Sequence, residues 1–164
     1  MSKPKIILVM ENLRSIYNVG ALLRTCEGLG VNQVVYIGTT PHPIVQDDQR
    51  LPFKAKQQTN QIAKTALGAE NSVSGDYYRY SKDFLESRDQ SKLLLTLEQN
   101  KKSVLLDGFC LSEDAYLVVG NEVDGVSKLL IEASDGVLEI PMLGHKESLN
   151  VEVAGAIAIY SLLH

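Results

Sequence analysis

Residues 5–38 have the sequence KIILVMENLRSIYNVGALLRTCEGLGVNQVVYIG, and their pattern decides the fold class. An apolar, β-branched run at 5–10 predicts a buried strand, and a second run at 32–38 predicts another. Between them, the spacing of the apolar residues predicts a helix over 19–29. Both strands are continuously apolar rather than alternating, which is typical of a sheet covered on both faces. This strand–helix–strand order predicts an α/β fold with a mostly parallel sheet and helices on both faces.

The rest of the chain continues the alternation of strands and helices. Further strands are predicted within 71–80 and at 103–109, 115–120 and 136–142. Further helices are predicted at 57–70, as one or two segments within 81–100, and at 127–134 and 148–163. Three prolines and no periodicity make 39–52 a long loop, and loops of that length are often functional. We find no repeat and no linker, and therefore expect one domain over residues 1–164.

The composition is that of a soluble globular protein, with 45% hydrophobic and 22% charged residues. No apolar run approaches the ~20 residues of a membrane span, and the N-terminus has no signal-peptide pattern. We therefore expect a cytoplasmic protein without a membrane segment. Cys26 and Cys110 form no CxxC motif and are expected to be reduced, packed thiols. The three histidines have no metal-ligand spacing with the cysteines, so no metal is expected.

The net charge of −4 is distributed unevenly along the chain. Residues 1–64 contain eight Lys and Arg against four Asp and Glu, whereas the remainder contains eight against sixteen. A polyanion such as RNA would therefore meet the N-terminal half. Taken alone, the imbalance is explained equally well by a solvated surface. The candidate residues for binding such a polyanion are Arg14, Arg50, Lys54 and Lys56.

A first polar motif, Asn18-x-Gly20-x3-Arg24, opens the helix expected at 19–29. Gly20, Arg24 and Gly28 are spaced to share one helix face, and Arg24 leans over Gly20 toward the helix start. Free N–H groups there favour an anion, and Asn18 stands at the expected N-cap. The combination suits a bound phosphate, and the alternative is a capped helix with a structural arginine. The opposite, core-facing stripe consists of Val19, Leu22, Leu23 and Cys26.

Two more polar motifs follow predicted strands in the second half of the chain. In VVGNEVDGVS, residues 118–127, a strand runs into Gly120 and Glu122, where ligand sites of α/β proteins usually lie. The alternative is a glycine-rich turn. In residues 140–163, Ser148 and Asn150 precede an apolar helix that either of them can cap. The chain contains no GxGxxG, P-loop or GxSxG motif, which disfavours a conventional dinucleotide fold, a P-loop NTPase and an α/β-hydrolase.

These three motifs, in this order, resemble those of the SpoU/TrmH family of RNA 2′-O-ribose methyltransferases, in the SPOUT superfamily. KTALGAE at 64–70 also resembles a linking segment of that family. The resemblance covers the chain from the first strand to the last helix and makes 1–164 a single SpoU-type domain. It implies a C-terminal trefoil knot, a rare feature among folds, and a homodimer packed partly through the last helix. It also implies that S-adenosyl-L-methionine is bound in the knot, by Leu106, Gly120, Ile140, Met142, Ser148 and Leu149.

The resemblance makes Arg24 the catalytic residue, facing the ribose 2′-hydroxyl and the adjacent phosphate of a tRNA or rRNA. Two roles are open for Arg24. A general base is one, although an arginine pKa above ~12 makes deprotonation costly at neutral pH. The other is a phosphate clamp that stabilises the developing alkoxide. Asn18, Glu122, Ser148 and Asn150 are implied to shape the pocket and orient Arg24.

Two other classes of protein stay open. A non-catalytic, knotted RNA-binding dimer would have the fold without needing the Arg24, Glu122 and Ser148/Asn150 set. A small-molecule α/β enzyme of another class would require a nucleotide-binding or acidic motif that the sequence does not contain. The sequence favours the methyltransferase and does not identify the RNA or the nucleotide.

Overall fold

The computed structural model describes residues 3–164 and forms one seven-stranded sheet in the order β3-β2-β1-β6-β4-β7-β5. Every pair of neighbouring strands in this sheet is parallel. The prediction of a mostly parallel α/β sheet is confirmed. The strands are β1 (Ile6–Glu11), β2 (Gln33–Ile37), β3 (Ser74–Tyr78), β4 (Leu93–Leu97), β5 (Val104–Leu105), β6 (Ala115–Val119) and β7 (Gly136–Glu139).

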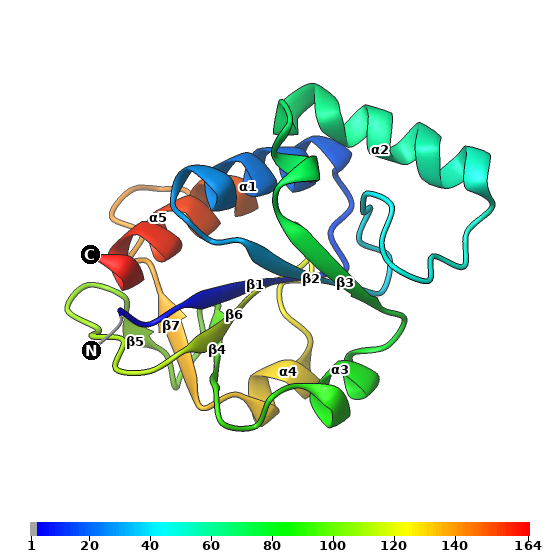
Figure 1. Cartoon of the computed structure of the whole chain (residues 1–164). Helices are drawn as coiled ribbons and strands as arrows, with labels where there is room; N and C mark the ends of the chain where they lie inside the picture. Colours follow the sequence, from blue (N-terminus) through cyan, green and yellow to red (C-terminus); the bar gives the residue numbers. More distant parts are fainter. Residues whose placement is uncertain (1–2) are drawn as a thin grey trace.

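Helices cover both faces of the sheet (Figure 1). Three of them, α1, α2 and α5, lie on one face, and the shorter α3 and α4 lie on the other. None of the helices within residues 3–164 is both long and apolar enough to cross a membrane. The helices are α1 (Ile16–Gly28), α2 (Pro52–Ala66), α3 (Ser81–Ser87), α4 (Lys128–Ala133) and α5 (Val151–Leu163), with a 3₁₀ turn η1 at Ala69–Asn71.

The central strands are buried on both sides, which explains their uninterrupted apolar runs. In β1, Leu8 and Met10 pack toward the α1 side, and Ile7 and Val9 pack toward the α3 side. Each fully buried aliphatic side chain stabilises the fold by about 1.5–3 kcal/mol relative to an exposed one. The predicted core stripe of α1 is confirmed, since all four of its members are fully buried.

Several predicted elements differ from the observed ones. Residues 93–97, predicted as part of a helical region, form the buried strand β4 between β6 and β7. A run of only five residues, four of them apolar, does not distinguish a strand from a helix by periodicity. Helix α2 begins at Pro52, five residues before the predicted start, because proline suits a first helical turn. Cys110, expected to be packed, is exposed, whereas burial raises the pKa of Cys26 to about 12.

Gly20 allows α1 and α2 to pack in close contact. A Cβ atom at Gly20 would lie 2.0 Å from Thr65 Oγ1 and 2.5 Å from the carbonyl oxygen of Ile62. The Thr65 hydroxyl also donates a hydrogen bond to the carbonyl of Tyr17, at 3.1 Å. The space above Gly20, expected to admit the side chain of Arg24, is therefore filled by α2. This crossing fixes the start of α1 against the rest of the fold.

Candidate active site

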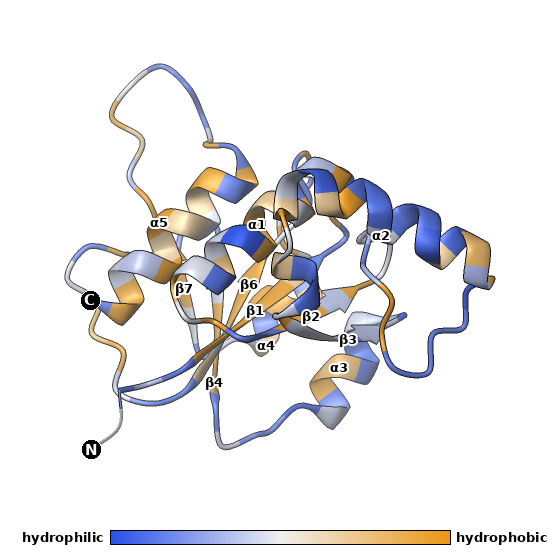
Figure 2. Ribbon diagram, turned by 45° about the horizontal axis from the view of Figure 1, so that its top comes forward, coloured by the Kyte–Doolittle hydropathy of each residue, from blue (hydrophilic) through white to orange (hydrophobic). Residues whose placement is uncertain are grey.

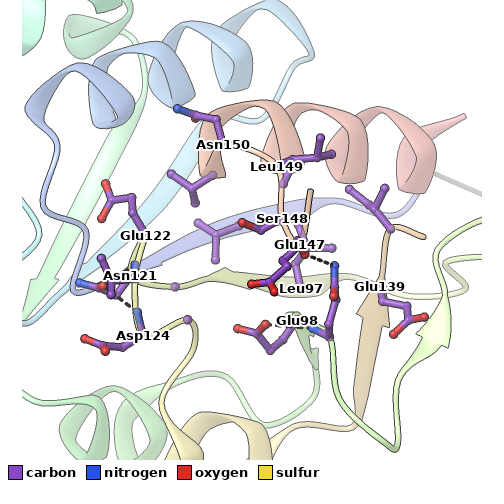
Figure 3. A pocket seen from close by; sticks show the side chains of 18 of the residues that line it. Leu97, Glu98, Asn121, Glu122, Asp124, Glu139, Glu147, Ser148, Leu149 and Asn150 are labelled. Carbon is purple, nitrogen blue, oxygen red and sulfur yellow. Dashed lines mark hydrogen bonds between the residues drawn. The ribbon is translucent and has the colours of Figure 1, made fainter. Parts of the chain in front are cut away.

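A cavity of about 570 Å³ opens at the carboxyl ends of β4, β6 and β7 (Figure 3). Its lining comes from residues 97–99, 119–125, 139–140 and 142, from the loop residues 147–150, and from Val151 and Ala154 of α5. The cavity lies next to the point where the chain order reverses, since β1 has β2 on one side and β6 on the other. Ligands of open α/β sheets bind at such a point, and the volume suits a small molecule.

The loop after β6 is a tight, preformed turn. The backbone groups of Asn121 and Gly125 exchange two hydrogen bonds, at 3.0 and 2.9 Å. The Asn121 side-chain oxygen accepts the N–H groups of Val123 and Asp124, at 2.8 and 3.0 Å. Gly120 leaves no room for a side chain, because a Cβ atom there would lie 2.3 Å from the backbone of Gly125. The loop therefore presents a fixed wall to the cavity.

Two strand-end carboxylates, not singled out from the sequence, hold the end of this loop. Glu98, directly after β4, accepts the N–H of Val126 at 2.9 Å. Glu11, the last residue of β1, is buried and accepts both the N–H and the hydroxyl of Ser127, at 2.8 and 2.6 Å. Glu11 also accepts the hydroxyl of Ser81 at the start of α3. The available signal was the position of each acid, at the end of an uninterrupted apolar strand.

Residues from all three sequence motifs meet at the mouth of the cavity. The side-chain amide of Asn18 donates to Glu122 Oε1 at 3.0 Å, and the Asn150 amide approaches Asn18 Oδ1 at 3.4 Å. Glu122 also accepts the backbone N–H groups of Arg14 and Ser15, at 2.9 and 3.1 Å. One carboxylate thus ties the loop after β6 to the start of α1, and Asn18 extends the link to α5.

The capping of the two helices explains why these amides are free to meet. Ser15, not the predicted Asn18, is the N-cap of α1, and its hydroxyl accepts the Asn18 N–H at 3.2 Å. The helix begins three residues earlier than expected, so the Asn18 side chain points to Glu122 instead of capping. Of the two candidate caps of α5, Ser148 and Asn150, the structure has Asn150, whose side chain accepts the N–H of Glu152 at 2.8 Å.

Glu122 is an ionised acceptor in this network. Burial alone would raise the pKa of Glu122, but the hydrogen bonds from Arg14, Ser15 and Asn18 outweigh it and lower the pKa. The carboxylate is therefore charged at neutral pH. It is suited to hold backbone and amide groups in place rather than to carry a proton during a reaction.

The other predicted site residues occupy three different positions. Five of the six predicted cofactor-binding residues line the cavity: Gly120, Ile140, Met142, Ser148 and Leu149. The sixth, Leu106, is buried in the core, and its N–H donates to the carbonyl of Glu139 at 2.9 Å. Arg24 is exposed on α1, and within residues 3–164 its side chain has no hydrogen bond or ion pair. Its catalytic role stays a prediction.

Arg50 fixes the long loop 39–52 from within. Its five N–H groups all donate to groups of the chain: the carboxylate of Asp48, the carbonyls of His42 and Pro43, and the side chain of Gln58. These bonds attach the loop to α2. A contact between Arg50 and RNA, as predicted, would have to replace some of them.

The remaining predicted RNA-binding residues are exposed. Lys54 and Lys56 lie on α2, which projects from the body and is largely hydrophilic (Figure 2). Helix α2 contains three lysines and no Asp or Glu. Arg14 is exposed beside Glu122, at the cavity mouth. In the described part of the chain, no group of three or more His, Cys, Asp or Glu side chains is placed to hold a metal ion.

The sequence of the whole domain matches an established family model. The model, described as the SpoU rRNA Methylase family, aligns with residues 5–160. The chain belongs to this family. The match includes the cavity, the Asn18–Glu122–Asn150 network, helices α1 to α4 and most of α5, and it confirms the resemblance to SpoU/TrmH methyltransferases.

The chain is also similar to individual members of the family. It is 27% identical over 161 residues to the 23S rRNA (guanosine-2′-O-)-methyltransferase RlmB of Neisseria meningitidis, and this alignment covers 97% of this chain and 58% of that protein. It is 30% identical over 158 residues to the tRNA (guanosine(18)-2′-O)-methyltransferase of Borreliella burgdorferi, with 94% and 64% covered. The chain therefore spans less than two thirds of the length of either relative.

Solved structures share the fold. The AdoMet-bound rRNA methyltransferase from Sinorhizobium meliloti matches with a TM-score of 0.80 at 18% identity. The match covers 98% of this chain and 56% of that one. The chain thus shares the α/β fold of this solved methyltransferase.

We predict that Glu122→Gln weakens the link between the loop after β6 and the start of α1. The free energy of unfolding should then be lower at pH 7 and should fall less steeply as the pH is lowered. A carboxylate with a lowered pKa stabilises the fold fully above its unfolded pKa, near 4.5, and the stabilisation is lost as the pH falls through the folded pKa. Loss of the charge on these hydrogen bonds should cost about 0.5–1.5 kcal/mol at pH 7, because Glu122 is exposed and water replaces part of what is lost. Urea unfolding of both proteins between pH 3.5 and 7 measures this.

The matched control for this prediction is Glu113→Gln, which changes an exposed carboxylate at the other end of β6. It should leave the profile unchanged. Equal profiles for Glu122→Gln and the wild type would show that the junction contributes nothing to stability.

Proposed function

We propose that the protein transfers a methyl group from S-adenosyl-L-methionine to a ribose 2′-hydroxyl of tRNA or rRNA, as a single domain over residues 1–164. The observation that supports this most is the meeting of Asn18, Glu122 and Asn150, from three distant parts of the chain, at the mouth of one cavity. The Neisseria and Borreliella relatives are named as guanosine-2′-O-methyltransferases of rRNA and tRNA, respectively. Such substrates suit a cytoplasmic enzyme.

The cavity fits S-adenosylmethionine in size and chemistry. Its volume of about 570 Å³ suits a nucleoside with an amino-acid tail. Apolar side chains for an adenine ring alternate with backbone and amide groups for polar substituents. When bound, the cofactor supplies a methyl group activated by the positive sulfur. The residues that would hold it are Leu97, Gly120, Ile140, Met142, Ser148 and Leu149.

The chain contributes alignment more than proton transfer. Glu122 holds the start of α1 against the loop after β6, and Asn18 and Asn150 connect that junction to α5. A substrate between these elements would meet groups whose positions are set before binding. Fixed relative placement of reacting groups accounts for a large part of many enzymatic accelerations.

Arg24 binds the phosphate next to the target ribose in this proposal. Its exposed guanidinium has no partner within residues 3–164, so all of its donors are available to a ligand. A guanidinium binds two oxygens in a fixed plane, whereas its high pKa makes it a poor base. The clamp is therefore favoured over the general base.

The proposal includes a homodimer and a C-terminal trefoil knot. Helix α5 exposes Val153, Ile157 and Tyr160, and the last two line a hollow shared with Thr25 and Gly28 of α1. A second copy packed there would cover this apolar surface and lie next to Arg24. Support for the knot comes from family membership and from the excursion between β7 and α5, which extends from the body before returning to the cavity (Figure 2).

The RNA surface of the proposal lies on α2 and at the mouth of the cavity. Lys54, Lys56 and Arg14 are exposed there. Because α2 contains no Asp or Glu, its three lysines are its only charged side chains, on a protein of net charge −4. Arg50 supports this surface by fixing the adjoining loop to α2.

We predict that Arg24→Ala and Arg24→Lys both lose methyl transfer while retaining the fold and the affinity for S-adenosylmethionine. Alanine removes the charge, and lysine keeps it but loses the planar fork. The loss should be on the order of 10²-fold, as for other transition-state contacts. Single-turnover transfer to bulk tRNA and rRNA, the Tm and calorimetric cofactor affinity are measured on the three proteins.

Two results would contradict this account of the function. A single-turnover rate of Arg24→Lys within a few-fold of the wild-type rate would show that Arg24 has a structural role and not a catalytic one. A wild-type protein that binds RNA and S-adenosylmethionine without transferring the methyl group would favour the non-catalytic RNA-binding dimer.

We predict that Lys54→Ala combined with Lys56→Ala weakens RNA binding and its salt dependence. Removal of each lysine that binds a phosphate should reduce the log–log salt slope by roughly 0.7–0.9. The matched control is Lys101→Ala combined with Lys102→Ala, an exposed lysine pair in the connection between β4 and β5. Filter binding to tRNA is measured between about 50 and 200 mM KCl for the wild type and both double variants. A salt slope for the Lys54/Lys56 variant equal to that of the control variant would show that RNA does not bind on α2.

A further inference from the structure

The proposed cofactor cavity has an acidic lining without compensating bases. Of its lining residues, none is Lys, Arg or His. Within residues 3–164, none of its carboxylates has a cationic group within 4.0 Å, because the four ion pairs of the fold all lie elsewhere. The acidic lining residues are Glu98, Glu122, Asp124, Glu139 and Glu147.

Three of these carboxylates have roles in the fold, and two do not. Glu98 and Glu122 accept backbone N–H groups, and Glu139 accepts the hydroxyl of Ser103. These bonds stabilise the charges without neutralising them. By contrast, the carboxylates of Asp124 and Glu147 have no hydrogen-bond partner in the part of the chain that the structure describes. In Figure 3, the side chains of Glu98 and Glu147 lie at the centre of the view, with Asp124 to one side.

Such a lining favours a cationic ligand over a neutral one of the same shape. Like charges around one cavity repel each other, and a positive ligand relieves that repulsion. Leu97, Ile140 and Leu149 add apolar walls to the cavity, whereas Asp124 and Glu147 are exposed, so solvent and salt screen part of their effect. An acidic wall therefore discriminates between ligands by charge.

We propose that this lining selects S-adenosylmethionine over S-adenosylhomocysteine and thereby promotes release of the spent cofactor. The inference rests on the proposed function. In the transfer, the 2′-oxygen bonds to the methyl carbon and loses its proton to solvent. The electron pair of the broken carbon–sulfur bond stays on sulfur, which becomes neutral. The product thus loses the sulfonium charge and keeps only the α-ammonium charge, which both ligands carry.

Comparison of S-adenosylmethionine with S-adenosylhomocysteine isolates the effect of the sulfonium charge on affinity. They share the adenosine and the amino-acid tail, so contacts to those parts cancel in the ratio of their dissociation constants. The methyl group and the positive charge are the only differences. Sinefungin, which has a protonated amine at the place of the sulfonium, separates the charge from the methyl group.

The test is calorimetric titration of the wild-type protein, Asp124→Asn, Glu147→Gln and the double variant with all three ligands. The wild type should bind S-adenosylmethionine and sinefungin more tightly than S-adenosylhomocysteine. Each substitution should reduce that preference by about two- to fivefold, as expected for charges several ångströms apart at intermediate dielectric. Raising the KCl concentration should reduce it as well. Glu113→Gln, at the opposite end of β6, is the control and should change nothing.

The outcomes distinguish this inference from the proposed function. A preference that is unchanged in the double variant, with a wild-type Tm, would overturn the role of the acidic lining. Equal losses of affinity for all three ligands would overturn it too, because a structural role does not depend on ligand charge. A wild-type protein that binds none of the three would instead refute the proposed function.

Discussion

The carboxylate of Glu122 is the group on which the arrangement of the site depends. It accepts two backbone N–H groups at the start of α1 and the side chain of Asn18, and so joins segments that are more than 100 residues apart in sequence. Charge-assisted bonds of this kind are among the stronger contacts in a fold. Without them, the direct polar link between the loop after β6 and the segment leading into α1 would be the hydrogen bond from the Asn121 side chain to the carbonyl of Asn12, at 2.7 Å. The same hydrogen bonds lower the pKa of Glu122, because they stabilise its charged form.

Two other carboxylates also hold a loop by its backbone N–H groups. Glu11 and Glu98 each end a buried strand and hold the segment 126–127 by its backbone. Parallel strands all present their carboxyl ends at one edge, so acids at those ends can bind the loops that cross it. The chain thereby builds a rigid ligand wall from short glycine-containing turns. It also concentrates negative charge at the proposed cofactor cavity, which gives the acidic lining a structural origin as well as a proposed selective effect.

Local pattern was sufficient to predict much of the fold, and non-local contacts account for what was missed. The core stripe of α1 and the continuously apolar strands follow from side-chain periodicity, which is a local property. Strand β4 was assigned to a helical region because its pairing with β6 and β7 cannot be seen in five residues. The sequence also did not indicate that α2 fills the space above Gly20, or that Arg50 is engaged by its own loop. The motif residues were recognised as a set because their separations resemble those of a family, whereas the hydrogen bonds that join them required the folded chain.

The central claim is that the cavity between the loop after β6 and the start of α5 binds S-adenosylmethionine. The most direct measurement is a titration of ¹⁵N-labelled protein with S-adenosylmethionine, followed by amide chemical shifts. The account predicts the largest shifts at residues 97–99, 119–125 and 140–151, with smaller shifts at the start of α1 through Glu122. Shifts confined to the hollow between α1 and α5, with residues 119–125 unperturbed, would contradict it.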